Sequence, residues 1–531
     1  MLNKILPIDD WPSVVLLLFF GLHLARNIFY QLFIWQLKEY RLDRMRIFLL
    51  SPAGKQWMFG KIAIIKWLLL VVYLLFEPVQ TIIWPLLGIF ALESVLIIKE
   101  WIHGVKRPQF TLKLTVVTLG TVILLFVPFW FIQLPVPLLI LTLDKLLPLV
   151  VSLLLVVFMV PAYFYRQLMV RRATKKLQKF PKLTRIGITG SYGKSSTKEY
   201  LATILAEKFR VVKTEKTLNT DIGIARTILK NVTAKSEVMV TEMGAYKRGE
   251  IAQLSWMVKP TIGIITAINE QHLELFGSLE QTRKAKYELI ENLPQNGLAV
   301  FNADNQYTRL MAKKTHHCQV LTYGYEKNAD VRISETEVTS KEIAFKLHFG
   351  KTVLTCRASL SGKQQVYAIA AAATVAWYLK LTPAQITRGI NLLTPLSHTM
   401  QIAGEYKGAT LIDDTFNANP DSVRAAVDYM QTWIGKKYLV LTPLIELGGQ
   451  TFSQHEKLIK EELVKVDRIY LTNTTYFKEF KDVARKLHLP ESLVVAASHK
   501  IAQELTKIIS TNDVVVFEGR EARRVLAALQ N

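Results

Sequence analysis

Apolar residues are distributed unevenly along this chain. Long hydrophobic runs dominate the part before about residue 166, whereas the remainder alternates short apolar runs with polar and charged segments. A helix needs about 20 consecutive apolar residues to cross the core of a bilayer. The runs therefore predict about five membrane-crossing helices, at 11–35, 63–76, 81–98, 114–132 and 146–164, of which the second is short.

Charge orients these predicted spans. Lysines and arginines are concentrated at 38–61, 99–113 and 166–185, while the connections at 77–78 and 134–145 carry few. The positive-inside rule then predicts a multi-pass protein of the cell membrane, with its N-terminus outside and its large C-terminal region in the cytoplasm. We expect the stretch 166–185, which contains no acidic residue, to contact anionic lipid headgroups.

Two ionisable residues, His23 and Arg26, lie within the first apolar run. At membrane depth such groups usually face a partner or a water-filled cavity, although an arginine can also extend its side chain to the interface. Two interpretations stay open: spans that only anchor the protein, and spans that also bind a lipid-linked substrate.

The pattern after residue 180 predicts an α/β region. Short apolar strands alternate there with helices of mixed polarity, which is typical of a mostly parallel sheet covered by helices on both faces. We expect three domains: a helical membrane domain at 1–180, a P-loop domain with a doubly wound sheet at 181–395, and a smaller Rossmann-like domain at 396–531. Strands of the last domain are predicted at 437–441, 468–472 and 513–517.

Composition narrows the choice of partners. The formal net charge is +23, from 66 Lys plus Arg against 43 Asp plus Glu, which favours an anionic partner. The long apolar runs make that partner a membrane lipid, and nucleic acid is not expected. The two cysteines, Cys318 and Cys356, lie far apart, so neither a disulfide framework nor a cysteine zinc site is predicted.

A glycine-rich segment, T-G-S-Y-G-K-S-S at 189–196, follows a short apolar strand and opens a helix. Backbone N–H groups of such a turn, with the helix N-terminus, bind phosphate oxygens. We expect Lys194 to reach the β- and γ-phosphates of ATP and the Ser195 hydroxyl to help to hold Mg²⁺. The ATP-binding residues predicted here are Thr189, Gly190, Ser191, Tyr192, Gly193, Lys194, Ser195 and Ser196.

This short loop resembles that of the Mur ligases, which reads T-G-[ST]-x-G-K-[ST]-[ST]. Further segments resemble the same family, and its MurF members most, in the same order along the chain. They are L-N-T-D-I-G at 218–223, E-M-G-A at 242–245, H-L-E-L-F-G-S at 272–278, K-A-K-Y-E-L-I at 284–290, N-A-D-N at 302–305 and I-D-D-T-F-N-A-N-P-D-S at 412–422. The likeness covers about residues 183 to 531.

The resemblance implies metal ligands and catalytic residues. Ser195, Glu242 and His272 would bind Mg²⁺, and Lys286 stands where the family carries a carbamylated lysine that binds a second Mg²⁺. Lys194, His272 and Lys286 are the expected catalytic residues. From the residues alone, Glu242 could instead be a buried structural acid, His272 a core or surface residue, and Lys286 a solvated helix lysine.

The resemblance also implies contacts with the substrates. Asn302 and Asp414 would contact ATP, Asp414 at the ribose, while Asn219, Asn417 and Asn419 would contact the other substrates. Taken alone, the Asn- and Pro-rich stretch around 417–420 would be interpreted as an Asx turn and a helix cap.

The chain departs from the MurF pattern in several places. Gln365 and Ala368 stand where many members carry asparagines near the adenine, and Glu518 stands near the end, where MurF has K-G-S-R. The P-G-R linker between the last two domains is replaced by S-H-T at 397–399. Membrane helices replace the small N-terminal domain by which MurF binds a UDP-sugar, so a lipid-linked substrate becomes an alternative to a soluble one.

These features predict a membrane-anchored, ATP-dependent carbon–nitrogen ligase of cell-wall precursor synthesis. It would join a muropeptide or lipid-linked carboxylate to an amino acid or dipeptide amine through an acyl phosphate. One alternative is a MurT-like amidating ligase acting on a lipid-linked precursor, against which the missing four-cysteine zinc ribbon argues. The other is a non-catalytic nucleotide-binding scaffold for wall enzymes at the membrane.

Overall fold

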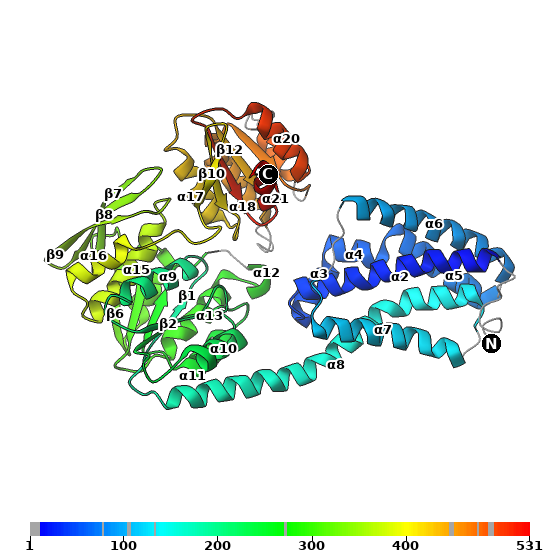
Figure 1. The fold of residues 1–531 in the computed structure, drawn as a ribbon, viewed down its shortest axis with the longest axis horizontal. Helices are drawn as coiled ribbons and strands as arrows, with labels where there is room; N and C mark the ends of the chain where they lie inside the picture. Colours follow the sequence, from blue (N-terminus) through cyan, green and yellow to red (C-terminus); the bar gives the residue numbers. More distant parts are fainter. Residues whose placement is uncertain are drawn as a thin grey trace. The chain divides into compact units, whose positions relative to one another are not determined.

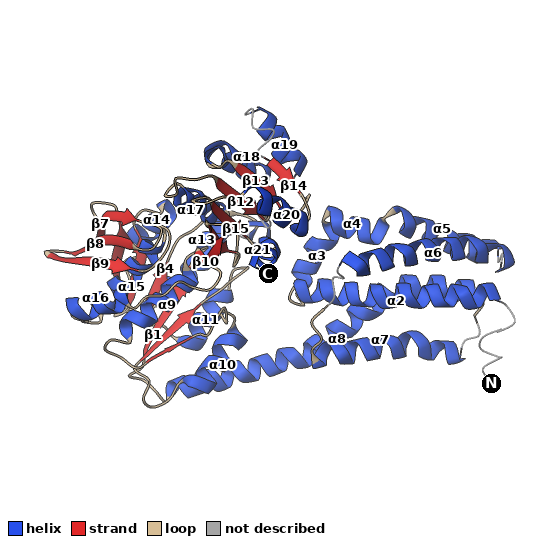
Figure 2. Ribbon diagram, turned by 45° about the horizontal axis from the view of Figure 1, so that its top comes forward, coloured by secondary structure: helices blue, strands red, loops and turns tan. Residues whose placement is uncertain are grey.

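The computed structural model describes residues 11–76, 79–103, 108–131, 134–269, 273–444, 451–474, 477–486 and 493–530. It contains two compact units, Met1–Tyr165 and Arg166–Asn531, which are drawn in Figure 1. Helices make up the first unit, and the second holds two sheets surrounded by helices (Figure 2). The predicted fold class, an α-helical region followed by α/β domains, is confirmed.

The first unit is built from apolar helices: α2 (Trp11–Leu37), α3 (Leu42–Leu50), α4 (Pro52–Phe59), α5 (Lys61–Phe76), α6 (Val79–His103), α7 (Leu112–Phe131) and the first part of α8 (Val136–Gln178). Among the described residues, four helical segments are long and apolar enough to cross a membrane: Trp11–Leu37, Ala53–Phe76, Thr81–Ile102 and Val136–Gln178. Helix α7, 20 residues long, coincides with the remaining predicted span at 114–132.

A cluster of four ionisable side chains lies inside this unit, one from each of α2, α5, α6 and α8. His23 Nδ1 is 2.9 Å from Glu93 Oε2, and His23 Nε2 is 2.7 Å from Asp144 Oδ1. The Lys66 ammonium lies 2.7 Å from the Glu93 carboxylate and 3.5 Å from that of Asp144. His23 thus faces partners, as expected for an ionisable group between apolar helices.

The first sheet of the second unit has nine strands in the order β2-β3-β1-β4-β5-β6-β7-β8-β9. Strands β1 to β7 pair in parallel, and β8 and β9 form an antiparallel extension. The strands are β1 (Thr184–Thr189), β2 (Val211–Lys213), β3 (Val238–Glu242), β4 (Ile262–Ile265), β5 (Leu298–Asn302), β6 (Gln319–Gly324), β7 (Val331–Val338), β8 (Ile343–Phe349) and β9 (Thr352–Ala358).

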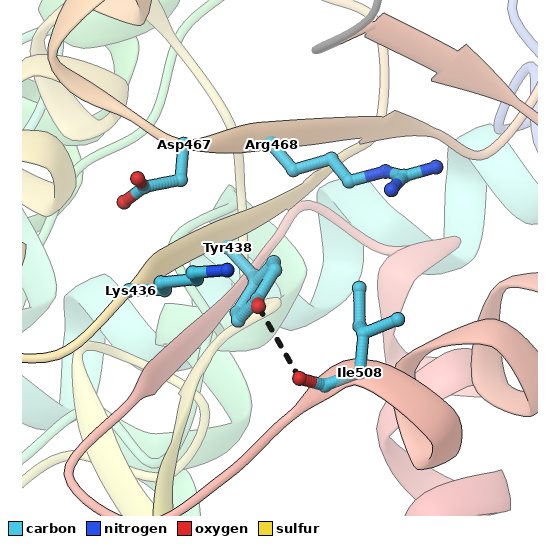
Figure 3. A pocket seen from close by; sticks show the side chains of 5 residues that line it. All are labelled: Lys436, Tyr438, Asp467, Arg468 and Ile508. Carbon is cyan, nitrogen blue, oxygen red and sulfur yellow. Dashed lines mark hydrogen bonds between the residues drawn. The ribbon is translucent and has the colours of Figure 1, made fainter.

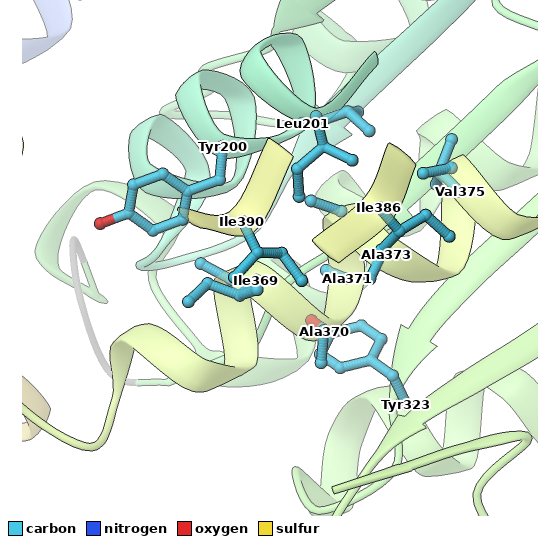
Figure 4. Close-up of a cluster of buried hydrophobic side chains, with 14 of the residues drawn as sticks. Tyr200, Leu201, Tyr323, Ile369, Ala370, Ala371, Ala373, Val375, Ile386 and Ile390 are labelled. Carbon is cyan, nitrogen blue, oxygen red and sulfur yellow. The ribbon is translucent and has the colours of Figure 1, made fainter. Parts of the chain in front are cut away.

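Helices cover both faces of this sheet, which explains why its central strands are apolar throughout and do not alternate. They are α9 (Lys194–Leu205), α10 (Asp221–Asn231), α11 (Glu250–Val258), α12 (Leu273–Phe276), α13 (Leu279–Glu291), α14 (Gln306–Lys314), α15 (Gln365–Tyr378) and α16 (Pro383–Asn391). Figure 4 shows the core on one face, where Leu201 of α9, Ile369 of α15 and Ile386 of α16 are fully buried.

The second sheet has the order β10-β11-β15-β12-β13-β14, with β10 antiparallel to β11 and the other pairs parallel. Its strands are β10 (Gln401–Tyr406), β11 (Ala409–Asp414), β12 (Lys437–Leu441), β13 (Arg468–Leu471), β14 (Leu493–Val495) and β15 (Val514–Glu518). Its helices are α17 (Pro420–Met430), α18 (Thr451–Glu461), η2 (Leu463–Lys465), α19 (Phe477–Lys486), α20 (Ser498–Ile508) and α21 (Ala522–Gln530). The three strands predicted for this domain occur within one residue of their expected bounds.

Candidate nucleotide and metal site

The glycine-rich loop lies where the strand order of the first sheet changes direction. From β1 the chain builds outward to β2 and β3 on one side, then crosses to β4 and β5 on the other. Open α/β sheets bind ligands at the carboxyl ends of their strands beside such a switch point. The predicted phosphate loop follows the carboxyl end of β1, so the fold itself creates a ligand site there.

Two glycines of this loop have backbone conformations that other residues rarely adopt. Gly190 has φ 146° and Gly193, the residue before α9, has φ 77°. A Cβ atom on Gly190 would lie 2.1 Å from the Thr266 hydroxyl oxygen. The loop is also fastened by hydrogen bonds, since Ser191 N donates to Ala267 O at 2.7 Å. The local sequence therefore specifies one loop shape, with the N-terminus of α9 behind it.

Lys194 is the first residue of α9 and lies against the loop. Its ammonium donates to the carbonyl oxygens of Gly190 at 2.7 Å and Ser191 at 3.0 Å. Burial lowers the pKa of Lys194, and the nearby negative charge of Glu242 opposes that effect. The Lys194 ammonium is thus held against a loop whose shape suits phosphate.

Glu242 ends strand β3 and is buried beside the loop. Its carboxylate accepts hydrogen bonds from the Ser195 hydroxyl at 2.9 Å and from the Asn219 side-chain amide at 3.0 Å. The Lys198 ammonium, one turn after Lys194, lies 3.5 Å from the same carboxylate. The sequence predicts Ser195 and Glu242 as metal ligands and Asn219 as a substrate contact, but sequence reasoning missed Lys198, although its spacing of four from Lys194 puts it on the same face of α9.

Lys286 of α13 is buried, with 3% of its surface exposed. Its ammonium donates to Ala245 O at 3.4 Å and lies 5.5 Å from the centre of the Phe276 ring. Burial, and then the positive charge of Lys194, lower the pKa of Lys286 to about 7, while nearby glutamates including Glu242 oppose the shift. This is not the solvated helix lysine that its sequence context alone would suggest.

The donors around Glu242 suit magnesium. Mg²⁺ prefers oxygen ligands and is commonly bound through one or two carboxylates together with phosphate oxygens and water. Ser195 and Glu242 supply a hydroxyl and a carboxylate side by side. Among the described residues, no group of three or more His, Cys, Asp or Glu side chains gathers as a ready metal site. His272, the other predicted ligand, lies outside the described residues.

The remaining predicted contacts are spread over the loop edges of both domains. Asn302 ends β5 and is nearly buried, and its side-chain oxygen accepts from Asp304 N at 2.9 Å. Asn419 caps α17 by accepting from Asp421 N at 3.0 Å and Ser422 N at 3.1 Å. Asn417 is exposed. Asn419 is therefore a helix cap, as the Asn- and Pro-rich stretch suggests when it is taken alone.

Known proteins share both of these α/β domains. The sequence profile of the Mur ligase middle domain matches residues 188–376, and that of the Mur ligase glutamate ligase domain matches residues 399–520. The chain belongs to the Mur ligase family.

Individual relatives narrow the likeness within the Mur ligases. The chain is 33% identical over 287 residues to a UDP-N-acetylmuramoyl-tripeptide–D-alanyl-D-alanine ligase of Mycobacterium tuberculosis, a match that spans 52% of this chain and 55% of that protein. It is 28% identical over 349 residues to the Bacillus subtilis ligase of the same name, spanning 64% and 74% of the two chains. The chain therefore spans little more than half the length of the mycobacterial relative.

Solved structures show the same fold. MurF of Thermotoga maritima, solved in complex with ADP, superposes with a TM-score of 0.61 at 26% identity over 69% of this chain and 83% of that one. MurF of Acinetobacter baumannii superposes with a TM-score of 0.63 at 24% identity over 69% and 81% of the two chains. The helical unit before residue 166 lies outside the matched family domains.

Positions where this chain departs from the Mur ligase pattern have structural partners of their own. Gln365, at an expected adenine position, accepts a hydrogen bond from the Tyr200 hydroxyl at 2.9 Å. His398 of the linker has φ 63°, a conformation that favours glycine, and its ring lies 2.7 Å from the Asp413 carboxylate. The hydrogen bond between the His398 ring and Asp413 would offset part of the strain that this conformation imposes.

Glu518 forms a buried carboxyl pair with Asp414. The two residues are register partners at the carboxyl ends of β15 and β11, and their side chains are hydrogen-bonded to each other. Glu518 Oε1 also accepts from the Ser422 hydroxyl at 2.6 Å. Burial raises the pKa of Asp414 to about 7 and raises that of Glu518 well above its usual value. Two such carboxyls share a proton at neutral pH, because both cannot ionise in contact without water.

The Glu518→Gln variant is expected to stabilise the second unit at alkaline pH. A raised pKa means that the contribution of the pair to stability is present below about pH 4 and is lost as pH rises through about 7. Glutamine keeps the acceptor for Ser422 and donates to Asp414 without needing the proton. We expect a thermal midpoint higher by roughly 2–4 °C at pH 8 and little changed at pH 5. A gain that is equal at both pH values would contradict the shared proton.

A pocket in the second sheet lies away from this edge. Lys436, Tyr438, Asp467, Arg468 and Ile508 line it (Figure 3). Four of its lining residues lie at the amino ends of β12 and β13, opposite the sheet edge that carries Asp414 and Glu518, and Ile508 ends α20. The pocket is therefore separate from the candidate site.

Proposed function

We propose that the chain is a membrane-anchored, ATP-dependent amide-bond ligase of cell-wall precursor synthesis, with its two Mur ligase domains in the cytoplasm. The arrangement of Lys194, Ser195 and Glu242 around the phosphate loop carries the proposal, because it unites a cation, a hydroxyl and a carboxylate at the switch point of the sheet. The relatives described above are named UDP-N-acetylmuramoyl-tripeptide–D-alanyl-D-alanine ligases. The long apolar helices support the membrane anchor.

The reaction would take place in two steps. A substrate carboxylate attacks the γ-phosphorus of ATP, which forms an acyl phosphate and releases ADP. An amine then attacks the acyl carbon, and inorganic phosphate leaves. Lys194 would neutralise charge on the phosphoryl oxygens during transfer, which is mainly a matter of position and electrostatics. Asn269, beside the loop, donates to Asp421 of α17 at 2.6 Å, so the C-terminal domain would exclude water from the acyl phosphate.

Other predicted residues have roles in the same scheme. Bound Mg²⁺ would offset the negative charge of the phosphates; Ser195 and Glu242 would hold one ion, and His272 with carbamylated Lys286 a second. The lowered pKa of Lys286 supports carbamylation, because only an unprotonated amine adds to CO₂. Asn302 and Asp414 would contact ATP, and Asn219, Asn417 and Asn419 the carboxylate and amine substrates.

Product analysis tests the reaction and the substrate together. The full-length protein in lipid nanodiscs, supplied with ATP and Mg²⁺, would receive either a UDP-linked or an undecaprenyl-linked muramoyl tripeptide. Each acceptor would be combined with D-Ala-D-Ala, single amino acids or ammonia. We expect one ADP per amide bond and a product mass increased by the dipeptide residue. Turnover of the lipid-linked acceptor but not of the UDP-linked acceptor would show that the membrane unit defines the substrate. Absence of ADP release with every pair of acceptor and amine would refute the proposal.

A further inference from the structure

The last part of helix α8 packs into the ligase unit. Beyond the apolar span, Val170, Ala173 and Leu177 are almost fully buried in a core cluster that includes residues of α10, among them Ile224 and Ile228. Intervening basic residues such as Arg171 and Lys175 remain exposed. The basic stretch expected to face lipid headgroups therefore has a second, apolar side that is already occupied by protein.

Polar contacts fasten both ends of this packing. The Lys176 ammonium donates to Leu229 O at 2.8 Å near the end of α10. At the other end, Arg166 forms a close ion pair with Asp221, the first residue of α10. Residues of α8 thus contact α10 at its first residue and near its end.

Arg166 balances the negative charge of the buried Asp221 carboxylate. Only 4% of the Asp221 side chain is exposed, and Arg166 is the one cation that contacts it among the residues described. Its other partners are neutral: Ile222 N donates to it at 2.7 Å and the Gln253 side-chain amide at 3.5 Å. A buried carboxylate that loses its cation is strongly destabilised, so the start of α10 would have to rearrange.

The start of α10 adjoins the candidate metal site. Thr220 caps the helix through its side chain, and the preceding Asn219 donates to the Glu242 carboxylate at 3.0 Å. The Asn219 carbonyl also accepts from Gly244 N at 2.9 Å. Residues 219–221 therefore link the ion pair of Arg166 and Asp221 to the side chain that orients the Glu242 carboxylate.

We propose that Arg166 is a positioning residue of the ligase site. Its ion pair with Asp221 fixes the turn at 218–221 and, through Asn219, the carboxylate that is expected to bind Mg²⁺. Arg166 lies on the helix that also carries the last apolar span, so the segment that continues the membrane helix is part of the ligase machinery and not only a tether. The effect on catalysis rests on the proposed function, whereas the effect on local structure does not.

The test compares Arg166→Gln with Arg171→Gln, an exposed arginine on the same helix, in the full-length protein. Hydrogen exchange of the amides at 218–224 reports the turn directly. We expect faster exchange there in Arg166→Gln only, and restored protection in Arg166→Gln/Asp221→Asn, where no buried carboxylate is left unpaired. In turnover assays the Mg²⁺ concentration for half-maximal rate and the KM for the carboxylate acceptor should both rise about tenfold, because Glu242 is the expected Mg²⁺ ligand and Asn219 a proposed substrate contact, while the KM for the amine stays within about twofold. Arg166→Lys should fall between wild type and Arg166→Gln.

The outcomes separate the two proposals. Exchange and KM values equal to those of Arg171→Gln would overturn the role of Arg166. A uniform increase in exchange across the unit, or equal losses for both substrates, would also overturn it, because either indicates general destabilisation. If the wild-type protein ligates no amine, the proposed function fails, and the exchange experiment still decides whether Arg166 orders the turn.

Discussion

Replacing Lys194 with alanine is expected to reduce ATP-dependent ligation at least about a hundredfold. The ammonium is positioned by the carbonyl oxygens of Gly190 and Ser191, at the start of the helix behind the phosphate loop. In the proposed reaction it neutralises charge that develops on the transferring phosphoryl group. Its loss therefore affects the transition state more than the ground state, and kcat should fall more than the KM for ATP rises. Steady-state ADP release with saturating acceptor and amine measures both quantities.

A matched control is Lys284→Ala. Lys284 is a lysine of α13, half exposed and paired with Glu280 at 2.7 Å on the protein surface. Exposed pairs of this kind contribute little to stability, so this variant should keep wild-type turnover and melting temperature. Retained ligation in Lys194→Ala would exclude this loop as the site of phosphoryl transfer. Loss of activity together with a large fall in melting temperature would show that the lysine supports the loop and not the reaction.

The position of the phosphate loop could be predicted from local sequence, because a strand, a glycine turn and a helix are all encoded within a few neighbouring residues. Gly190 and Gly193 illustrate this, since their positive φ angles are what the loop needs. The partners of Glu242, by contrast, could not be predicted from local sequence. Ser195 and Lys198 come from α9 and Asn219 from a separate turn, and only the order of strands in the sheet brings them to one carboxylate.

Burial explains the remaining differences between expectation and structure. Lys286 has the sequence context of an exposed helix residue, and its lowered pKa results from packing that no local pattern specifies. Arg166 belongs to the basic stretch at 166–185, whose sequence predicts only that it follows a membrane span and contacts lipid headgroups. Its contact with Asp221 depends on how α8 packs against α10. Only the tertiary structure distinguishes Lys286 and Arg166 from the lysines and arginines that neighbour them in the sequence.

The second large effect is expected in the helical unit, where Lys66→Met should lower the free energy of unfolding by about 3 kcal/mol or more. Lys66 is 2% exposed and contacts the carboxylates of both Glu93 and Asp144. Lys145 also pairs with Asp144 at 3.0 Å, but among the described residues Lys66 is the only lysine or arginine that contacts Glu93. Removing Lys66 therefore leaves the negative charge of Glu93 unbalanced between apolar helices, where water cannot stabilise it. Thermal unfolding of the full-length protein in nanodiscs, followed by the helical signal, would measure the loss.

Two further variants show whether pairing, and not side-chain volume, is responsible. Lys66→Met/Glu93→Leu removes one charge of each sign and should recover much of the stability lost in the single variant, since the buried charges are balanced again. Arg26→Gln breaks an ion pair between the same helices α2 and α6, but Glu100 is 52% exposed, and the loss should be below about 1 kcal/mol. A loss in the double variant equal to the sum of the losses in Lys66→Met and Glu93→Leu would mean that Lys66 and Glu93 do not stabilise each other. The cluster would then be a set of separate contacts, and its four residues would carry no common role in holding α2, α5, α6 and α8 together.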